Sequence, residues 1–236
     1  MNGVEALLFD TFGTLVDWRT SLIDDLTAFG DERGLRVEWP AFVDAWRNAQ
    51  KPAFARIARG EEPWANFDAI NRVTFDALAA EHGFATVLDE AARTWCVDRW
   101  HRLRPWPDTV RGLERLRARY ILGTLSNGSF RLLVDLARRA PLPMDLIFSA
   151  ESFGRYKRDP EVYRGAARLL AIPPERIMMV AAHNDDLQAA AAQGMRTAFI
   201  LRPTEYGPQQ TTNLAADAGI DVAVTSVEEL ADRLGA

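Results

Sequence analysis

Cysteine is almost absent from this sequence, since Cys96 is the one cysteine among 236 residues. A single cysteine excludes a disulfide within the chain and fits a protein of the reducing cytoplasm. No metal-binding or catalytic cysteine motif surrounds Cys96. We therefore expect it to be a small, buried side chain on a helix.

Long apolar runs and an excess of positive charge are missing as well. No apolar stretch reaches the ~18 residues that a membrane-spanning helix needs, and no basic leader followed by an apolar core opens the chain. The formal net charge of −5 gives no support to nucleic-acid binding. We expect a soluble, cytoplasmic protein without nucleic-acid or membrane partners, and we find no internal repeat or low-complexity segment.

The pattern of apolar residues predicts an α/β fold. With 48% hydrophobic residues the chain can fill a core, and 236 residues suit one large domain or one domain with an insert. Short apolar runs predict strands at residues 6–9, 120–125, 146–149, 177–181, 197–201 and 222–224. Helical spacing predicts helices at residues 111–119, 130–139, 160–171, 187–193 and 227–234, and residues 202–216 form a polar loop. Such alternation indicates a Rossmann-like, doubly wound parallel sheet with right-handed crossovers.

Residues 18–100 have a different character. Apolar residues at three- and four-residue spacing over 21–26 and 39–58 indicate amphipathic helices, aromatic residues are frequent, and no strand is predicted. We interpret residues 18–100 as a helical cap domain inserted after the first strand. Residues 1–17 and 101–236 then form the core domain, and we expect the cap to cover the ends of its strands.

Polar residues follow three of the predicted strands. Asp10 follows the first strand, segment 126–127 the second, and segment 183–186 the strand at 177–181. Because the carboxyl ends of neighbouring parallel strands converge, these groups are expected in one crevice. Each alone has a structural explanation: aspartates favour turns and helix starts, and a lone lysine such as Lys157 is usually solvated. The combination of these polar groups, with a helical insert after the first strand, is the specific signal of a shared site.

A set of motifs connects these groups to a known family. The chain carries Phe-Asp-Thr-Phe-Gly-Thr-Leu at 9–15, Leu-Ser-Asn-Gly-Ser at 125–129 and Tyr-Lys-Arg-Asp-Pro at 156–160. Tyr163, Asp186 and the cap segment Ala-Trp-Arg-Asn at 45–48 complete the set. Over nearly its whole length the sequence resembles the haloacid dehalogenase superfamily and, within it, the L-2-haloacid dehalogenases of type II.

The resemblance implies a hydrolytic dehalogenase that cleaves the carbon–halogen bond of short 2-haloalkanoic acids and gives 2-hydroxy acids. Asp10 is implied to be the nucleophile that forms an ester at C2, and Lys157 to keep it ionised. Thr14 is implied to hydrogen-bond Asp10 or the hydrolytic water, and Asp186 to pair with Lys157 and orient that water. The residues implied to contact substrate or halide are Thr11, Phe12, Arg47, Asn48, Phe67, Ser126, Asn127, His183 and Asn184.

Among these residues, Arg47 with Ser126 and Asn127 is implied to hold the substrate carboxylate, for which a planar fork of donors is well matched. His183 is expected to line the site, either as a ligand contact that donates to the departing halide or as a structural histidine at the end of a strand. The resemblance implies no cofactor and no metal ligand. The implied partners are a 2-halocarboxylate and halide, with a second copy of the chain as a candidate partner in a homodimer.

Phe12 separates this branch from the phosphatases of the superfamily, which carry an aspartate two residues after the nucleophile. A phenyl ring can neither give nor take a proton, whereas a halide leaves as a weak base and needs none. Relatives in this branch commonly carry Tyr, Gln, Ser-Ser-Asn and Trp where this chain has Phe12, Asn48, residues 181–183 and Asp185. Two alternatives remain: a magnesium-dependent phosphatase that uses Asp10, and a catalytically silent binding protein that retains the fold.

Overall fold

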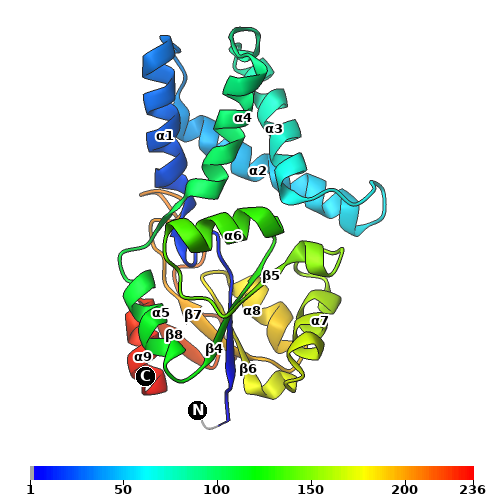
Figure 1. Ribbon diagram of the computed structural model, residues 1–236, viewed down its shortest axis with the longest axis vertical. Coiled ribbons are helices and arrows are strands. Elements are labelled where there is room, and N and C mark those ends of the chain that lie inside the picture. The colour runs from blue at the N-terminus through cyan, green and yellow to red at the C-terminus, as the bar shows by residue number, and fades with distance from the viewer. Residues whose placement is uncertain (1–2) are drawn as a thin grey trace. The chain divides into compact units, whose positions relative to one another are not determined.

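The computed structural model of this chain describes residues 3–236 and divides into two units (Figure 1). The core unit joins Met1–Asp17 to Arg104–Ala236, and the helical unit is Trp18–Leu103. A short antiparallel ribbon of β2 (Val16–Asp17) and β3 (Arg104–Pro105) lies where the chain leaves and re-enters the core unit.

Six parallel strands form the main sheet of the core unit, which confirms the predicted doubly wound α/β fold. Their order is β5-β4-β1-β6-β7-β8. The bounds are β1 Ala6–Phe9, β4 Ile121–Ser126, β5 Leu146–Ser149, β6 Ile177–Ala181, β7 Arg196–Ile200 and β8 Val222–Val224. β1 is fully buried, because helices cover both faces of a parallel sheet and its strands are apolar throughout.

The register brings the ends of three strands together. Phe9, the last residue of β1, pairs with Thr124 of β4 on one side and with Val180 of β6 on the other. The sheet is wound in opposite directions from this point, since β4 and β5 lie on one side of β1 and β6 to β8 on the other. Open α/β sheets bind ligands at such a switch point, beyond the carboxyl ends of the strands.

Helices flank this sheet (Figure 1). They are α5 Thr109–Arg117, α6 Phe130–Arg139, α7 Pro160–Leu170, α8 Asn184–Ala191 and α9 Val227–Leu234, with the short 3₁₀ helices η3 Ala150–Ser152 and η4 Pro174–Arg176. α5 and α9 pack side by side. Gly112 permits this approach, because a β-carbon there would lie 2.6 Å from the carbonyl carbon of Val227.

Two predicted helices begin earlier in the structure. α5 begins at Thr109 instead of residue 111, and the Thr109 hydroxyl donates to the Leu15 carbonyl oxygen, a distant contact that no local pattern carries. α8 begins at Asn184 instead of residue 187, because Asp185 and Asp186 occupy its first turn. Carboxylates in a first turn stabilise the free amide groups of a helix.

The helical unit contains α1 Trp18–Arg33, α2 Trp39–Ala58, α3 Phe67–Glu81 and α4 Glu90–Asp98, with the 3₁₀ helices η1 Ala85–Val87 and η2 Arg99–Arg102. Aromatic side chains fill its centre, where the Trp46 ring lies 5.1 Å from that of Phe75 and 5.6 Å from that of Trp100. Cys96 of α4 is buried, as predicted, and burial raises the pKa of its thiol to about 12.

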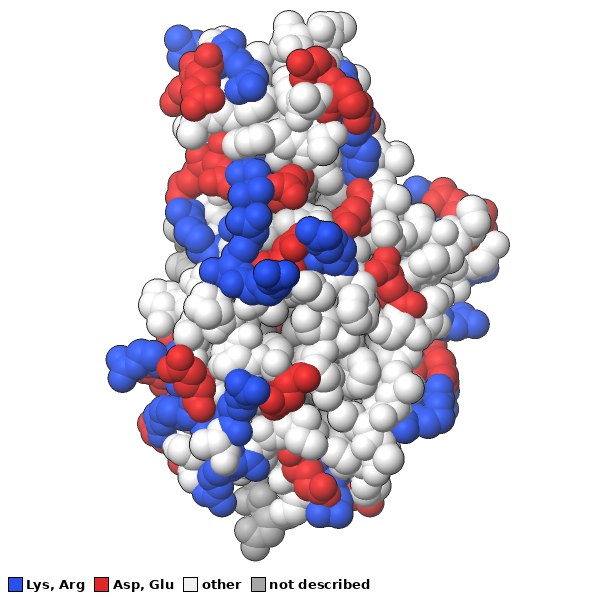
Figure 2. Space-filling view, in the orientation of Figure 1, with Lys and Arg blue, Asp and Glu red and all other residues white. Residues whose placement is uncertain are grey.

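The charged surface is mixed. Acidic and basic side chains are interspersed over the face in Figure 2, with no broad field of one sign. Among residues 3–236, no helix combines the length and the apolar character needed to cross a bilayer.

Candidate active site

Asp10 lies one residue beyond β1, and its backbone N–H donates to the Val180 carbonyl oxygen at 2.9 Å. The chain then turns sharply, so that the N–H groups of Leu15 and Val16 both donate to the Thr11 carbonyl oxygen. Asp10 is only 6% exposed. An ionised carboxylate this buried needs charged or hydrogen-bonding partners.

The turn after Asp10, which we call the Asp10 loop (residues 10–16), is held from outside by three side chains. Trp106, Thr109 and Arg202 donate to the carbonyl oxygens of residues 13, 15 and 14, at 2.9, 2.9 and 3.1 Å respectively. Each backbone oxygen thus has a fixed partner, which orients the loop before any ligand binds.

Lys157 is the cation beside Asp10. Its ammonium group donates to Asp10 Oδ1 at 2.8 Å, to Asp186 Oδ2 at 2.6 Å and to the Leu125 carbonyl oxygen at 2.8 Å. These contacts use all three ammonium protons. Burial alone would lower the pKa of Lys157, but the charges of Asp10 and Asp186 hold it above its usual range. Lys157 is therefore a fixed positive charge.

The second oxygen of Asp10, Oδ2, faces Thr14 and His183. The Thr14 hydroxyl donates to Oδ2 at 2.9 Å and accepts from the Ala182 N–H at 2.9 Å. The contact with Ala182 therefore fixes the hydroxyl proton of Thr14 toward Asp10. His183 Nδ1 lies 3.3 Å from Oδ2. Burial by itself would raise the pKa of Asp10, yet Lys157 and His183 hold it well below its usual range. Asp10 is thus a carboxylate at neutral pH.

Asp186 lies in the first turn of α8 and is 2% exposed. The Tyr163 hydroxyl of α7 donates to Asp186 Oδ1 at 2.5 Å, while Lys157 occupies Oδ2. Burial raises the pKa of Tyr163 above its usual range, and the charge of Asp186 adds to this effect, so the phenol stays a donor. Tyr163 belongs to the quoted motif, but the sequence analysis assigned it no role.

His183 joins Asp10 to a second buried carboxylate, Glu205. His183 Nε2 lies 3.0 Å from both carboxylate oxygens of Glu205, which is 1% exposed. Burial would lower the pKa of His183, but the charge of Glu205 and the contact with Asp10 raise it to about 10. In the resulting imidazolium both N–H groups meet carboxylates, which favours the alternative in which His183 does not contact the halide.

Glu205 was not among the site residues predicted from the sequence. The residue lies in the segment 202–216, which was predicted as a polar loop and contains no helix or strand. Acidic side chains in polar loops are usually solvated, and no spacing or motif distinguishes this one. Only its tertiary contact with His183 identifies it.

Two of the expected substrate contacts bind backbone in the structure. Asn127 Oδ1 accepts from the Lys157 N–H at 2.8 Å, and Asn127 Nδ2 donates to the Lys157 carbonyl oxygen at 3.4 Å. Asn184 Nδ2 donates to the Ala215 carbonyl oxygen at 2.8 Å, and Asn184 Oδ1 accepts from the Asp217 N–H at 2.9 Å. Asn127 therefore positions the lysine, and Asn184 fixes the loop before β8.

The other core-unit residues that we expected to contact the substrate are Ser126, Thr11 and Phe12. Ser126 Oγ accepts from the Gly128 N–H at 3.3 Å and keeps its own proton for a further acceptor. Thr11 Oγ1 is buried and has no hydrogen-bond partner within residues 3–236. Phe12 is 2% exposed, and a β-carbon on Gly128 would lie 3.1 Å from its ring. The two hydroxyls can serve a ligand, and Phe12 adds an apolar surface without a proton donor.

Arg47 belongs to the helical unit, where a buried polar chain orients it. Arg47 Nη1 donates to Gln50 Oε1 at 2.8 Å, and Gln50 Nε2 donates to Asn71 Oδ1 at 2.6 Å. Gln50 and Asn71 are fully buried. The guanidinium carbon lies 5.7 Å from the ring centre of Trp18, within reach of a cation–π interaction.

Asn48 and Phe67 are the other expected contacts of the helical unit. Asn48 is exposed and accepts from Lys51 Nζ at 3.0 Å. Phe67 is fully buried, and its ring centre lies 5.3 Å from that of Trp100 in an edge-on arrangement. Phe67 thus belongs to the aromatic centre of this unit.

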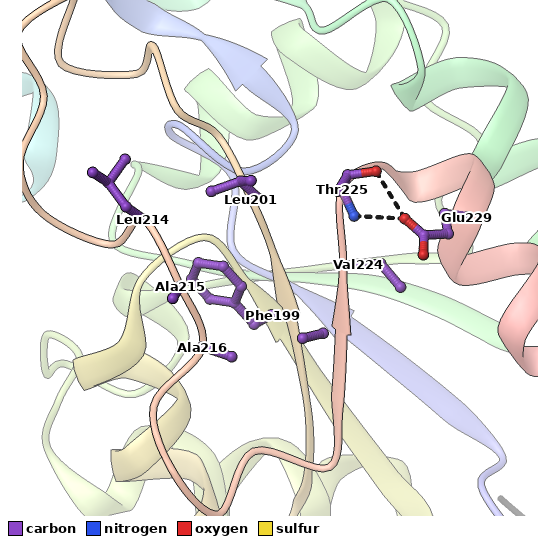
Figure 3. Close-up of a pocket in the computed structure, with 9 residues that line it drawn as sticks. Phe199, Leu201, Leu214, Ala215, Ala216, Val224, Thr225 and Glu229 are labelled. Atoms are coloured by element: carbon purple, nitrogen blue, oxygen red, sulfur yellow. Dashed lines mark hydrogen bonds between the residues drawn. The ribbon is translucent and has the colours of Figure 1, made fainter.

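A cavity of about 260 Å³ lies elsewhere in the core unit (Figure 3). It is lined by Phe199, Leu201, Leu214, Ala215, Ala216, Ala223, Val224, Thr225 and Glu229. Its one carboxylate, that of Glu229, accepts from the backbone and side chain of Thr225, as the dashed lines show. The cavity holds none of the expected site residues and no positive charge for a carboxylate substrate.

The acidic residues near Asp10 are paired with cations. Asp186 contacts Lys157 at 2.6 Å, and Asp185 forms an ion pair with Arg158. Among residues 3–236, no group of three or more His, Cys, Asp and Glu side chains is arranged to hold a metal ion.

Known dehalogenases share both sequence and fold with this chain. (S)-2-Haloacid dehalogenase 1 of Pseudomonas sp. (strain CBS-3) is 29% identical over 213 residues, which cover 87% of this chain and 89% of that protein. The crystal structure of the L-2-haloacid dehalogenase PA0810 is 48% identical, with a TM-score of 0.96 and 99% of each chain covered. That of the defluorinating L-2-haloacid dehalogenase Rha0230 is 41% identical, with a TM-score of 0.96 and coverage of 99% and 96%.

A family profile extends this similarity beyond single relatives. The family described as haloacid dehalogenase-like hydrolase matches residues 4–194, a range that contains Asp10, Thr14, Lys157 and Asp186. With its Asp10 loop, Lys157 and its sheet order, this chain belongs to the haloacid dehalogenase-like hydrolase family.

Proposed function

We propose that this protein is a hydrolytic dehalogenase that replaces the halogen at C2 of a short 2-halocarboxylic acid with a hydroxyl group. Relatives named for this activity on (S)- or L-2-haloacids support the proposal. The observation that carries it is the buried ion pair of Asp10 and Lys157, 2.8 Å apart, with Phe12 two residues after the nucleophile. This arrangement supplies an ionised nucleophile and no proton donor at the place where phosphatases need one.

In the first half-reaction, an oxygen of Asp10 attacks C2. A bond forms between that oxygen and C2, the carbon–halogen bond breaks, and its electron pair leaves with the halide. Because halides are weak bases, the departure needs no proton from Phe12. Attack from the side opposite the halogen inverts C2 and leaves a neutral ester on Asp10.

In the second half-reaction, water adds to the Cγ carbon of this ester. The bond between Cγ and the ester oxygen then breaks, that oxygen stays on C2, and the Asp10 carboxylate forms again with an oxygen from water. One proton of the water passes to the hydroxyl of the product and the other passes to solvent. Asp186, fixed by Lys157 and Tyr163, is suited to orient that water.

We assign recognition of the substrate carboxylate to Arg47 and the Ser126 hydroxyl. A guanidinium group presents two parallel donors that match a carboxylate, and the Gln50–Asn71 chain orients Arg47 within its own unit. Ser126 follows the strand next to β1 and retains a proton to donate.

The phosphatase alternative is less consistent with the donor set. Mg²⁺ binds to carboxylate oxygens that are open to it, together with several waters. Here the Lys157 ammonium lies between Asp10 and Asp186, and Asp185 is paired with Arg158. These residues do not fit a divalent cation. A silent binding protein would have no need to keep Asp10 ionised against its burial.

Halide release from both enantiomers of 2-chloropropionate, with excess chelator, tests the proposal. We expect release from the (S) enantiomer to persist in chelator and to disappear in Asp10→Asn, since an amide is a far poorer nucleophile. Phosphate release from model esters that stops on chelation and returns with magnesium would instead identify a phosphatase. Release of neither product would leave the binding-protein alternative.

A further inference from the structure

The two oxygens of Asp10 have different surroundings. Oδ1 faces Lys157 at 2.8 Å, whereas Oδ2 faces the Thr14 hydroxyl at 2.9 Å and His183 Nδ1 at 3.3 Å. His183 in turn meets Glu205 at 3.0 Å. A continuous line of contacts therefore runs from a loop carboxylate, through an imidazole ring, to one oxygen of the nucleophile.

Glu205 is packed directly against the Asp10 loop. A β-carbon on Gly13 would lie 2.1 Å from Glu205 Oε1 and 2.2 Å from its carboxyl carbon. Gly13 has φ +83°, a left-handed conformation that favours glycine. The loop thus leaves space at Gly13 that the Glu205 carboxylate fills.

The loop that carries Glu205 is anchored on both sides of it. Arg202 binds the Thr14 carbonyl oxygen and forms two hydrogen bonds of 2.7 and 2.9 Å with Asp108. Gln210 Nε2 donates to the Arg202 carbonyl oxygen at 3.0 Å, and Gln210 Oε1 accepts from the backbone of Tyr206 at 2.9 Å. Glu205 is therefore held at a fixed distance from His183.

The effect of a cationic donor on Oδ2 differs between the two half-reactions. In the first, Asp10 passes from a carboxylate to a neutral ester, so a donor that stabilises its negative charge opposes the attack. In the second, the addition of water places negative charge back on a carboxyl oxygen of Asp10. A donor fixed in advance at that oxygen lowers the barrier to this step.

We propose that Glu205 is a positioning residue that holds the His183 imidazolium against Asp10 Oδ2 and so accelerates the hydrolysis of the ester rather than its formation. The inference rests on the proposed function. His183 and Thr14 then form the two donors toward the oxygen that becomes negatively charged when water adds to Cγ. In this ester Oδ1 is bonded to C2 and Oδ2 is the carbonyl oxygen. The electron pair of the carbonyl moves onto Oδ2 when water adds, and it returns when the bond between Cγ and Oδ1 breaks.

The groups that face His183 agree with a charged ring. Asp10 comes from the end of β1 and Glu205 from the loop after β7, and both are carboxylates. The Tyr206 hydroxyl lies 3.4 Å from Nε2. Lys157 contacts the other oxygen of Asp10. Two carboxylates in contact with the ring favour the imidazolium.

Rapid-quench measurement of halide release from (S)-2-chloropropionate separates the two half-reactions. For Glu205→Gln we expect a burst of one halide per enzyme at nearly the wild-type rate, followed by steady release about tenfold to a hundredfold slower than wild type. The ester should accumulate on the Asp10 peptide, where mass spectrometry detects it. Glu205→Asp should restore part of the steady rate.

Glu175→Gln provides the matched control, because it makes the same change at an exposed glutamate that precedes β6, whereas His183 follows that strand. It should leave the burst and the steady rate at their wild-type values, with no extra ester. Equal slowing of both phases in Glu205→Gln, without ester accumulation, would overturn the proposal. A wild-type enzyme that released no halide would instead contradict the proposed function itself.

A measurement on the wild-type protein covers the case in which Glu205→Gln does not fold. Nitrogen NMR of the histidine rings, with the His183 signals assigned by their absence in His183→Asn, reports which ring nitrogens carry protons. We expect both nitrogens of His183 to be protonated at neutral pH. A neutral ring at that pH would overturn the proposal, because it would leave no positive charge beside Oδ2.

Discussion

The ammonium nitrogen of Lys157 lies 2.8 Å from Asp10 Oδ1, and both groups are almost completely buried. The two residues are 147 positions apart in the chain. Their contact ties the end of β1 to the segment before α7 and holds the pKa of Asp10 below its usual range.

Replacement of Lys157 by Met should lower kcat/KM by at least about a hundredfold, since two buried carboxylates would lose their shared cation. The charge of Lys157 lowers the pKa of Asp10, so its removal raises that pKa. Because the carboxylate is the active form, the acid limb of the pH–rate profile should move to higher pH. Arg155→Met, which removes an exposed cation two residues away, should leave the profile unchanged. An unshifted acid limb in Lys157→Met would show that Lys157 does not control the ionisation of Asp10.

Gly13→Ala should destabilise the protein by about 1–3 kcal/mol through backbone strain, and by more where the new methyl group displaces Glu205. Gly219→Ala is the matched control, because Gly219 has φ +91° but open space around its β-carbon position. Urea unfolding of both variants isolates the effect of the Glu205 contact. Equal losses of unfolding free energy in the two would show that Glu205 moves aside at no cost.

Arg47→Lys keeps the charge but loses the planar pair of donors. We expect kcat/KM for 2-chloropropionate to fall roughly tenfold to more than a hundredfold, corresponding to about 1.5–3 kcal/mol for a charge-assisted hydrogen bond. Arg56→Lys, at an exposed position of the same helix, should have no effect. Wild-type kinetics in Arg47→Lys would show that the paired donors of Arg47 do not recognise the substrate.

The contacts of His183 revise its expected effect on the halide. Because both ring nitrogens meet carboxylates, His183→Asn should slow turnover of bromoacetate and chloroacetate by the same factor. Fluoroacetate gives the same ester on Asp10, so its loss of turnover should be no larger than that factor. A loss of turnover that grows as the leaving group becomes poorer would show that His183 donates to the departing halide.

Much of the fold could be predicted because local patterns encode it. The apolar run at 6–9 and the helix at 130–139 agree with β1 and α6 residue for residue. The start of α5 could not be predicted, because the Thr109 hydroxyl binds a carbonyl oxygen 94 residues away. Chain folding, rather than helical periodicity, creates that contact.

The site was predictable to the extent that family motifs describe it. Asp10, Lys157 and Asp186 lie together in the structure, at the ends of neighbouring strands and helices. Glu205 lay outside every motif, and the backbone contacts of Asn127 and Asn184 depend on loops whose path no sequence pattern describes. Side chains that orient other groups were therefore the part that sequence reasoning could not find.

The source of the product oxygen tests the central claim, that Asp10 is the nucleophile. A single turnover, with enzyme in excess over (S)-2-chloropropionate, would be run in water labelled with heavy oxygen, and the 2-hydroxy acid and the Asp10 peptide would be weighed by mass spectrometry. We predict an unlabelled hydroxyl in the product and one heavy oxygen in Asp10, because the carboxylate donates its own oxygen and recovers one from water. A labelled product and an unlabelled Asp10 after the first turnover would show that water attacks C2 directly, and would contradict the account.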